Sequence, residues 1–443
     1  MEKVTFVKIQ PPWQYDPYSD PPLGMLSVAE ATRKEESHDV LFHDMAHQKE
    51  LPSSEIYALS ASTLEFPGAI EIAEKIKSTH PGSLIIAGGP HFDVFSEDYW
   101  KNAIRNLPLD IICRGEGEET MPRALKYAQD ARGEDHVISQ QGGLLVLDEI
   151  GMPSRDLLSK ERYFKPGKTF AGGENYITGN SSTIMVSRGC PFSCSFCASP
   201  ELHKRRVRFR SLEKVEQELD LLQDVYGVSA LRWQDDCMPL TLKRINGLAD
   251  QLNARGIFSR GSARTDEIKP GILDNLWYSG FREIGFGIES AEQDVLDYLH
   301  KGTKIETNKN ALLETRRAGF KTRAFIMTGL PGETRDSAKY MIDFLEETNP
   351  DVVTLTSFVP LPGCDIYRSP EKYGVKILSE DWAQYNIALS RDSRVPWTHT
   401  IETASVGEME TNREHLKEYL FNKGKSNVAV YNADYTADIP TTP

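Results

Sequence analysis

The feature that most constrains the fold is an alternation of short apolar runs with helical patterns, which fills the first ~130 residues. A helix is predicted over residues 23–33, and another carries the apolar positions Ile70, Ala73 and Ile76. Such alternation is typical of a parallel sheet covered by helices. The region is therefore predicted to be an α/β, doubly wound (Rossmann-like) domain, with strands at residues 4–9, 39–42, 56–60, 84–87 and 110–113.

A second alternating array begins at residue 183 and holds six predicted strands, too few for a closed eight-stranded barrel. These strands are expected at residues 183–186, 230–233, 259–264, 283–288, 322–327 and 352–356, and a further helix is expected around residues 409–421. Residues 131–182 are rich in glycine and polar side chains, as linkers are. The predicted units are an N-terminal domain (1–130), a linker (131–182), a partial (β/α)6 TIM-type barrel (183–360) and a C-terminal cap and tail (361–443).

Composition excludes several classes of protein. No apolar run approaches the ~18–20 residues that a membrane span requires, and the N-terminus has no apolar signal core. We therefore expect a cytoplasmic protein with reduced thiols. The formal net charge of −14, from 51 Lys and Arg against 65 Asp and Glu, argues against a protein that coats nucleic acid. Six cysteines are too few for a disulfide scaffold.

Half of the cysteines lie close together, directly after the first strand of the second array. Cys190, Cys194 and Cys197 have the spacing C-x3-C-x2-C. A cluster of four irons is normally held by four thiolates, so three thiolates leave one iron open to a substrate or cofactor. The alternatives are unrelated buried thiols or a structural zinc site, which normally takes four protein ligands. His203 is the nearest further ligand type in the sequence.

This cysteine loop, with Phe196 before its last cysteine, resembles that of the radical S-adenosylmethionine (radical SAM) superfamily. The resemblance implies a [4Fe-4S] cluster held by Cys190, Cys194 and Cys197 at the mouth of the partial barrel. It implies that the open iron binds the amino and carboxylate groups of SAM. Reductive cleavage of SAM would then give methionine and a 5′-deoxyadenosyl radical, which abstracts a hydrogen atom from substrate. The barrel would orient this chemistry and exclude water.

The resemblance also implies the residues that contact SAM. Carboxylates that follow the second barrel strand would meet the amino group, an arginine after the third would pair with the carboxylate, and a glutamate after the fourth would bind the ribose hydroxyls. An adenine-binding stretch would follow the fifth. The implied contacts are Phe196, Asp235, Asp236, Arg264, Glu289, Gly329 and Leu330. A helix N-cap is the alternative role for Asp236, and a surface ion pair is the alternative for Arg264.

The N-terminal domain resembles the cobalamin-binding domain that precedes the barrel in one branch of this superfamily. The resemblance implies cobalamin contacts in three loops, at Ser60, Ser62, Thr63, Gly88, Gly89, His91, Gly115 and Glu116. The motif that supplies a cobalt-ligating histidine in other cobalamin proteins is absent, and residues 10–13, Gln-Pro-Pro-Trp, stand in its place. A lone histidine such as His91 also has a purely structural alternative.

The leading hypothesis is a cobalamin-dependent radical SAM methyltransferase that acts on an unactivated centre of a small molecule or peptide. SAM would serve both to methylate cobalamin and to generate the radical. The resemblance also implies an electron donor such as flavodoxin or ferredoxin. One alternative is a radical SAM cyclase, rearrangement or oxidation enzyme without methyl transfer, and another is a non-catalytic metal-binding module. Cys113, Cys237 and Cys364 receive no assigned role, although Cys113 is expected in the core.

Overall fold

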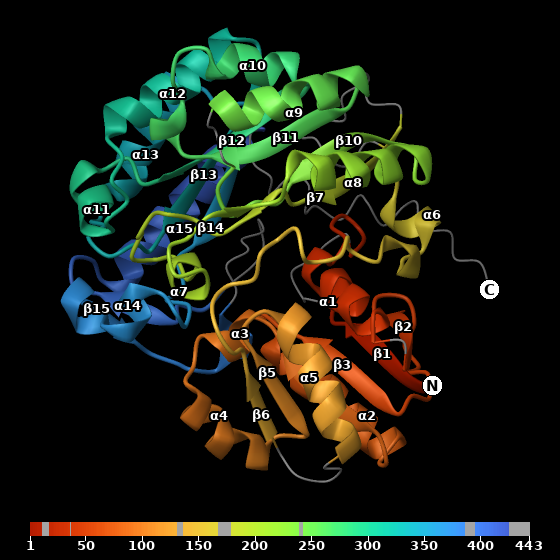
Figure 1. Ribbon diagram of the computed structural model, residues 1–443. Coiled ribbons are helices and arrows are strands. Elements are labelled where there is room, and N and C mark those ends of the chain that lie inside the picture. Colours follow the sequence, from red (N-terminus) through yellow and green to blue (C-terminus); the bar gives the residue numbers. More distant parts are fainter. Residues whose placement is uncertain are drawn as a thin grey trace.

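The computed structural model describes residues 1–10, 17–35, 37–130, 136–166, 179–238, 242–385 and 395–424. Two α/β domains lie one against the other, each built on a six-stranded parallel sheet (Figure 1). The predicted fold class, a Rossmann-like sheet followed by a partial barrel, is therefore confirmed. Within the described ranges, no helix is both long and apolar enough to cross a membrane.

The N-terminal sheet has the strand order β2-β1-β3-β4-β5-β6. Alternate side chains of its strands enter two separate cores, one on each face, as expected for a doubly wound sheet. Its strands are β1 (Glu2–Lys8), β2 (His38–Asp44), β3 (Ile56–Ser60), β4 (Leu84–Gly88), β5 (Ile111–Arg114) and β6 (His136–Ser139). Its helices are α1 (Leu23–Arg33), α2 (Phe66–Thr79), α3 (Pro90–Asp93), α4 (Glu97–Ala103) and α5 (Gly117–Asp130).

Two features of this domain bear on the site. The order reverses between β1 and β3, and the crevice at such a switch point is where open α/β sheets bind ligands. Strand β6 pairs in parallel with β5, so the sheet continues into the segment expected to be a linker. Cys113 is buried in the core of this domain, as expected.

The second sheet has the order β14-β13-β12-β11-β10-β7 and curls beneath an outer layer of helices (Figure 1). Its strands are β7 (Asn180–Ile184), β10 (Val228–Trp233), β11 (Phe258–Ala263), β12 (Phe281–Glu289), β13 (Lys321–Thr328) and β14 (Val352–Ser357). The covering helices are α8 (Leu212–Asp224), α9 (Leu242–Ala254), α10 (Ile272–Tyr278), α11 (Gln293–Tyr298), α12 (Ile305–Arg317) and α13 (Ser337–Thr348). Apolar side chains such as Leu231, Ile284, Phe286 and Ile326 form the core between them.

Shorter elements complete the barrel and attach it to the N-terminal domain. They are α6 (Lys160–Tyr163), β8 (Ser187–Arg188), α7 (Ser199–Leu202), β9 (Arg208–Phe209), α14 (Asp365–Arg368), β15 (Val375–Ile377), β16 (His399–Ile401) and α15 (Val406–Lys423). Helix α15 starts with a capping box between Ser405 and Glu408 and packs on α13. The connecting segment is pinned by Arg155, which is fully buried and pairs with Glu218 at 2.6 Å.

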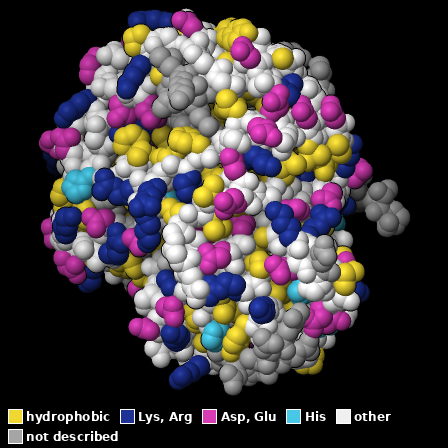
Figure 2. All heavy atoms as spheres, viewed as in Figure 1, with side chains coloured by type: hydrophobic (Ala, Val, Ile, Leu, Met, Phe, Trp, Pro, Cys, Tyr) yellow, Lys and Arg dark blue, Asp and Glu magenta, His cyan; other side chains and the backbone are white. Residues whose placement is uncertain are grey.

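Figure 2 displays the charged side chains on one face of the molecule. Acidic and basic side chains are interspersed over most of this face, while several Lys and Arg side chains gather on its left side, over the part where Figure 1 labels α7 and α14.

Candidate functional site

The three clustered cysteines lie in one loop at the carboxyl edge of the barrel. The base of this loop is closed by the antiparallel pair β8–β9, in which Arg188 lies opposite Arg208. Further along, the Ser195 N–H donates to the Leu299 carbonyl at 2.9 Å, and the Ser195 carbonyl accepts from the Ile366 N–H at 3.1 Å. Backbone contacts with two other parts of the barrel domain therefore fix the middle of the loop. All three thiols are partly exposed.

Asp235 and Asp236 come one residue after the end of β10. Both side chains hold the cysteine loop in place. Asp235 Oδ1 accepts from the N–H groups of Val186 at 3.2 Å and Ser187 at 2.5 Å. Asp236 accepts from the Gly189 N–H at 2.8 Å and from the Ser199 hydroxyl at 3.0 Å, so it joins the two ends of the cysteine segment. Burial raises the pKa of Asp235 to about 7. Both carboxyls thus face the loop, and neither caps a described helix.

Arg264, which directly follows β11, lies beside Cys194. Its Nη1 is 3.7 Å from Cys194 Sγ, and its guanidinium lies 3.7 Å from the centre of the Phe192 ring. Asp266 binds the guanidinium through both oxygens, at 3.0 and 2.9 Å. The side chain is buried, so the surface ion pair considered for Arg264 is not what the structure shows. Arg264 is a fixed cation next to one of the three thiols of the cysteine loop.

Glu289 and Lys301 form a second charged pair at the same edge. Glu289 ends β12 with a left-handed backbone (φ 65°), which turns its side chain to meet the Lys301 ammonium at 2.8 Å. Burial disfavours the charged Lys301, but the charges of Glu289 and Cys194 outweigh it and raise the pKa of the lysine. The ammonium also lies 5.8 Å from the centre of the Phe196 ring. Lys301 was not among the predicted site residues.

The predicted adenine-binding stretch begins where β13 ends. Gly329 has φ +82°, and a Cβ there would lie 2.3 Å from the Trp397 ring, so only glycine fits. The Gly329 carbonyl accepts from His399 Nε2 at 2.8 Å, and the Gly329 N–H donates to Glu333. Leu330 is fully buried in an apolar cluster that includes Phe196. The C-terminal segment, through Trp397 and His399, therefore forms part of the surroundings of Gly329.

The thiols themselves occupy different environments. A hydrogen bond with the Cys237 thiol lowers the pKa of Cys190 to about 7. Burial raises the pKa of Cys197 to about 12 and also raises that of Cys194. Among the described residues, no three His, Cys, Asp or Glu side chains converge as they would around one metal ion such as zinc. A four-iron cluster presents its irons at separate corners, so its ligands need not converge.

Most of the predicted cobalamin contacts meet at the carboxyl edge of the N-terminal sheet. A Cβ on Gly89 (φ +103°) would lie 2.8 Å from Ser60 Oγ, so the loops after β3 and β4 approach closely. His91 Nδ1 lies 3.1 Å from Thr63 Oγ1, and the ring is almost fully buried among aromatic side chains. Burial lowers the pKa of His91 to about 3. Ser62 lies in the loop after β3, and Gly88 is the last residue of β4, whereas residues 11–13 lie outside the described residues.

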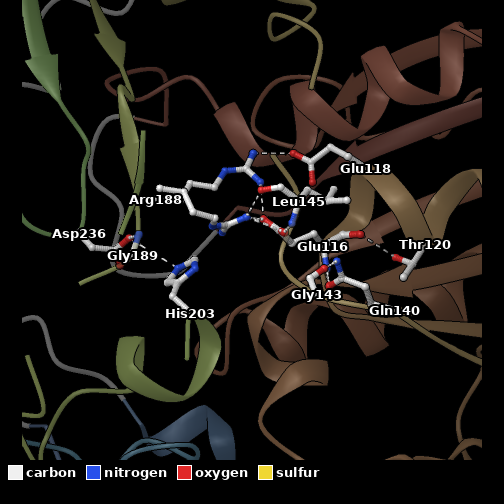
Figure 3. A network of polar contacts seen from close by, with 11 residues as sticks. Glu116, Glu118, Thr120, Gln140, Gly143, Leu145, Arg188, Gly189, His203 and Asp236 are labelled. Atoms are coloured by element: carbon white, nitrogen blue, oxygen red, sulfur yellow. Dashed lines mark hydrogen bonds and ion pairs between the residues drawn. The ribbon is translucent and has the colours of Figure 1, made fainter. Parts of the chain in front are cut away.

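The third loop of this edge turns toward the barrel. The Gly115 N–H donates to Asp93, and the Glu116 N–H donates to Gln140 at 3.0 Å. The Glu116 carboxylate meets Arg188 at 3.1 Å and Arg208 at 2.8 Å, both at the base of the cysteine loop (Figure 3). The contact predicted for Glu116 was cobalamin, but its oxygens are engaged by the barrel domain. Neither arginine carried a signal in the sequence that distinguishes it from a surface cation.

Two family models match the chain. The Radical SAM superfamily matches residues 184–345, and the B12 binding domain matches residues 17–125. An uncharacterised methyltransferase of Pyrococcus horikoshii is 26% identical over 389 residues, covering 82% of this chain and 81% of the relative. The anaerobic magnesium-protoporphyrin IX monomethyl ester cyclase of Cereibacter sphaeroides is 26% identical over 75% of this chain, which spans only 55% of the cyclase.

Among solved structures, the radical S-adenosylmethionine methyltransferase TsrM from Kitasatospora setae, with cobalamin and a [4Fe-4S] cluster bound, has the same fold. The TM-score is 0.62 at 14% identity, covering 96% of this chain and 82% of TsrM. A three-thiol loop at the mouth of a partial barrel, joined to a doubly wound domain, defines a class of iron–sulfur enzymes that use two organic cofactors. The chain contains a domain of the radical SAM superfamily, preceded by a B12 binding domain.

The two family models imply a [4Fe-4S] cluster, SAM and cobalamin as cofactors. The chemistry of the residues fits all three. Three thiols share one loop, and the cations of Arg264 and Lys301 beside Cys194 favour an anionic thiolate centre. At the N-terminal edge, Gly89 and Gly115 allow the loops that carry the predicted cobalamin contacts to pack closely on their neighbours.

Proposed function

We propose that this protein is a cobalamin-dependent radical SAM methyltransferase acting on an unactivated centre of a small molecule or peptide. When bound, the cluster and SAM would supply a reductively generated 5′-deoxyadenosyl radical, and cobalamin would supply a methyl group. The observation that carries the proposal is the meeting of the two carboxyl edges. Glu116, which follows β5, contacts Arg188, which precedes the first cluster cysteine by two residues. The two proposed cofactor sites therefore adjoin.

We further propose roles for the barrel residues. Cys190, Cys194 and Cys197 hold the cluster, and Asp235 and Asp236 position the backbone on which these thiols stand. The role proposed for the two aspartates thus shifts from contact with the SAM amino group to support of the loop. Their hydrogen bonds with Val186, Ser187, Gly189 and Ser199 support this change.

The remaining charged groups suit the polar ends of SAM. Arg264 lies beside Cys194 and can pair with a carboxylate, while Glu289 lies at the end of the next strand and can accept from ribose hydroxyls. Lys301 holds the Glu289 carboxylate in place. Phe196, Gly329 and Leu330 form an apolar wall with a close backbone approach, which suits a flat adenine ring.

In the N-terminal domain we propose that Ser60, Ser62, Thr63, Gly88, Gly89 and Gly115 line the cobalamin pocket. His91 is proposed as a support of this edge instead of a ligand, because it is buried, hydrogen-bonded to Thr63 and surrounded by Phe66, Trp100 and Trp382. A small iron–sulfur or flavin protein such as ferredoxin or flavodoxin is proposed as the electron donor.

The first experiment is anaerobic purification with added hydroxocobalamin, followed by an absorption spectrum and by cobalt and iron assays. Cobalt and about four irons per chain are expected, since both cofactors belong to the proposal. Absence of bound cobalt would contradict the methyltransferase assignment. Candidate substrates are then incubated with SAM, reductant and the loaded enzyme, and the products are separated by mass.

Similarity to a cyclase supports one alternative, a radical SAM reaction without methyl transfer. The two functions differ in their products. Methyl transfer from SAM yields S-adenosylhomocysteine in proportion to product, whereas the alternative yields product without it. Substrate turnover without S-adenosylhomocysteine would favour the alternative and overturn our proposal.

A further inference from the structure

The base of the cysteine loop carries a matched pair of cations. Residues 189–207 form the loop, and the antiparallel strands β8 and β9 close it. Arg188 and Arg208 occupy opposite positions in that pair, so their side chains leave the loop at the same point. A contact that restrains these two side chains therefore restrains both ends of the cluster-binding segment.

Both arginines are held by carboxylates of the N-terminal domain (Figure 3). Glu116 binds Arg188 at 3.1 Å and Arg208 at 2.8 Å, and Glu118 binds Arg188 at 2.5 Å. The four side chains are only 7–14% exposed. Solvent therefore screens these pairs far less than surface pairs. The two ends of the loop are tied through one carboxylate to the domain proposed to bind cobalamin.

Glu116 is itself fixed by the loop that surrounds it. Its N–H donates to Gln140 Oε1 at 3.0 Å, and its Oε2 accepts from the Leu145 N–H at 2.6 Å. The preceding Gly115 N–H donates to Asp93 at the end of α3. The position of Glu116 thus depends on three segments at the carboxyl edge of the N-terminal sheet, where the ligand of an open α/β sheet binds.

The opposite side of the cysteine loop is held by the barrel. Asp236 accepts from Gly189 and Ser199, and His203 Nε2 lies 3.6 Å from the same carboxylate. Arg208 has two buried donors, Nε and Nη2, without an acceptor among the described residues. Loss of Glu116 would therefore leave a largely buried guanidinium with few acceptors, while the Asp236 contacts persist. Glu116 and Glu118 both link the loop to the other domain, and of the two it is Glu116 that binds both Arg188 and Arg208.

We infer that the Glu116–Arg188–Arg208 bridge couples the two cofactor sites energetically. In this inference, Glu116 is a positioning residue: cobalamin orders the edge that holds Glu116, Glu116 orders the base of the cysteine loop, and a loaded cluster in turn favours cobalamin binding. Such coupling is reciprocal by thermodynamic necessity. The inference rests on the proposed function, because it assumes that the N-terminal domain binds cobalamin.

The test is a thermodynamic cycle on the full chain. Hydroxocobalamin dissociation constants are measured anaerobically for cluster-free and cluster-loaded protein, in the wild type, Glu116→Gln and Glu119→Gln. Glu119 lies on the same helix, and its contacts are inside its own domain: it pairs with Arg123 at 3.2 Å and accepts from the Gln141 N–H at 2.8 Å, so it is a matched control for the bridge to the barrel. We expect cluster loading to tighten binding about tenfold in the wild type and in Glu119→Gln, within the usual range of coupling. In Glu116→Gln the ratio should fall close to one.

A direct contact of Glu116 with cobalamin would change the dissociation constants of cluster-free and cluster-loaded protein by the same factor. The ratio of the two constants is therefore insensitive to such a contact. Equal ratios in Glu116→Gln and Glu119→Gln, or a wild-type ratio of one, would overturn the coupling. If Glu116→Gln does not fold, Glu118→Gln replaces it, and a ratio between one and the wild-type value is expected because only one of the three ion pairs is lost.

A second measurement needs no cobalamin and separates the bridge from the proposed function. Cluster-free protein is treated with iodoacetamide, and alkylation of Cys190, Cys194 and Cys197 is followed by mass spectrometry. Glu116→Gln should be alkylated several-fold faster than Glu119→Gln, since its loop base is released. Equal rates would overturn the anchoring itself. Faster alkylation without cobalamin binding in any form would keep the anchor and reject both the coupling and the proposed methyl transfer.

Discussion

Each of the two sheets has six parallel strands and a proposed ligand site at its carboxyl edge, yet the two edges differ in chemistry. Of the residues predicted to contact SAM, four are charged types, namely Asp235, Asp236, Arg264 and Glu289. Of those predicted to contact cobalamin, only Glu116 is charged at neutral pH, because His91 is buried with a pKa of about 3. The barrel edge is organised by charge throughout, whereas at the N-terminal edge charge is confined to the loop after β5, which carries Glu116 and Glu118.

This difference shows how each edge is stabilised. The charged residues of the barrel are partners of one another and of the cysteine loop, as in the Glu289–Lys301 and Arg264–Asp266 pairs. Such pairs are pre-oriented before a ligand with charged amino and carboxylate groups arrives. The N-terminal edge instead depends on close backbone packing at Gly89 and on the buried ring of His91. Substitutions at the two edges should therefore fail in different ways.

The largest effect is expected from the thiols. Replacing Cys190, Cys194 or Cys197 with Ala should abolish iron retention and SAM cleavage, because each change removes one of three ligands. Cobalamin binding should persist, although about as weakly as in cluster-free wild-type protein. Iron assay, 5′-deoxyadenosine formation and cobalt binding are the measurements, and Cys113→Ala is the control. SAM cleavage at the wild-type rate in any one of the three variants would contradict the assignment.

The next effect concerns the pH dependence of folding stability, which is expected to have opposite signs for one buried group in each domain. Burial lowers the pKa of His91 to about 3 in the folded protein, whereas the usual value for the unfolded chain is 6.5. As the pH falls below 6.5, the unfolded chain therefore binds a proton at His91 that the folded protein does not bind. Stability from His91 is therefore present above that pH and lost below it, by about 1.4 kcal/mol per pH unit. His91→Asn should remove this slope. An unchanged slope in thermal unfolding of cluster-free protein would contradict the burial argument.

Asp235 should act in the other direction. Its pKa is raised to about 7 by burial, above the usual 3.8, so the folded protein binds this proton more tightly. Its contribution to stability is present below the usual value and is lost as pH rises toward 7, again by about 1.4 kcal/mol per unit. Asp235→Asn should reduce this loss of stability with rising pH, as measured by thermal unfolding of cluster-free protein. A matching slope in Asp235→Asn and wild type would show that the carboxyl titrates normally.

A smaller effect is expected from Glu289→Ala. The loss of one charged hydrogen-bonding group should weaken SAM binding by about tenfold or more while the cluster still assembles. Equilibrium dialysis with SAM and the visible absorption of the cluster are the measurements. Glu306, whose side chain is 71% exposed on α12, provides the control through Glu306→Ala. Unchanged SAM affinity in Glu289→Ala would assign this residue a structural role only.

The smallest effect is expected from Cys364→Thr. Cys364 is fully buried and its sulfur accepts from the Tyr367 N–H at 3.3 Å, so it caps α14. A threonine hydroxyl can make the same cap, and the free energy of unfolding should change by less than about 1 kcal/mol. Iron content and SAM cleavage should match the wild type. A loss of iron in this variant would instead point to a role for Cys364 near the cluster.

Much of the fold was predictable because buried parallel strands are continuous apolar runs. All six barrel strands were expected within a few residues of their bounds, and α1 was expected at the residues where it occurs. Strand β7 starts earlier than expected because its first residues, Asn180, Ser181 and Ser182, are polar. Strand β6 was missed because four residues, His136–Ser139, next to glycine and charged residues are too short a signal.

The site was less predictable than the fold. The cysteines follow from spacing alone, but the partners of each side chain depend on contacts far apart in the sequence. Asp235 binds backbone groups about fifty positions earlier, and His399 meets Gly329 from the C-terminal segment. Arg188 and Arg208 pair with Glu116 across the domain boundary. Which of several possible partners a side chain contacts depends on the packing of the whole chain, and a local sequence pattern does not contain that information.

The C-terminal segment has a consequence for the order of biosynthesis. His399 and Trp397 complete the wall around Gly329, and Asn412 on α15 donates to the Thr334 carbonyl at 2.7 Å. These residues leave the ribosome after every strand of the barrel, and domains fold largely in the order of their synthesis. The surroundings of the stretch proposed to bind adenine therefore cannot be complete on a nascent chain that lacks this segment. Maturation into a SAM-binding enzyme is an event that follows translation of this segment.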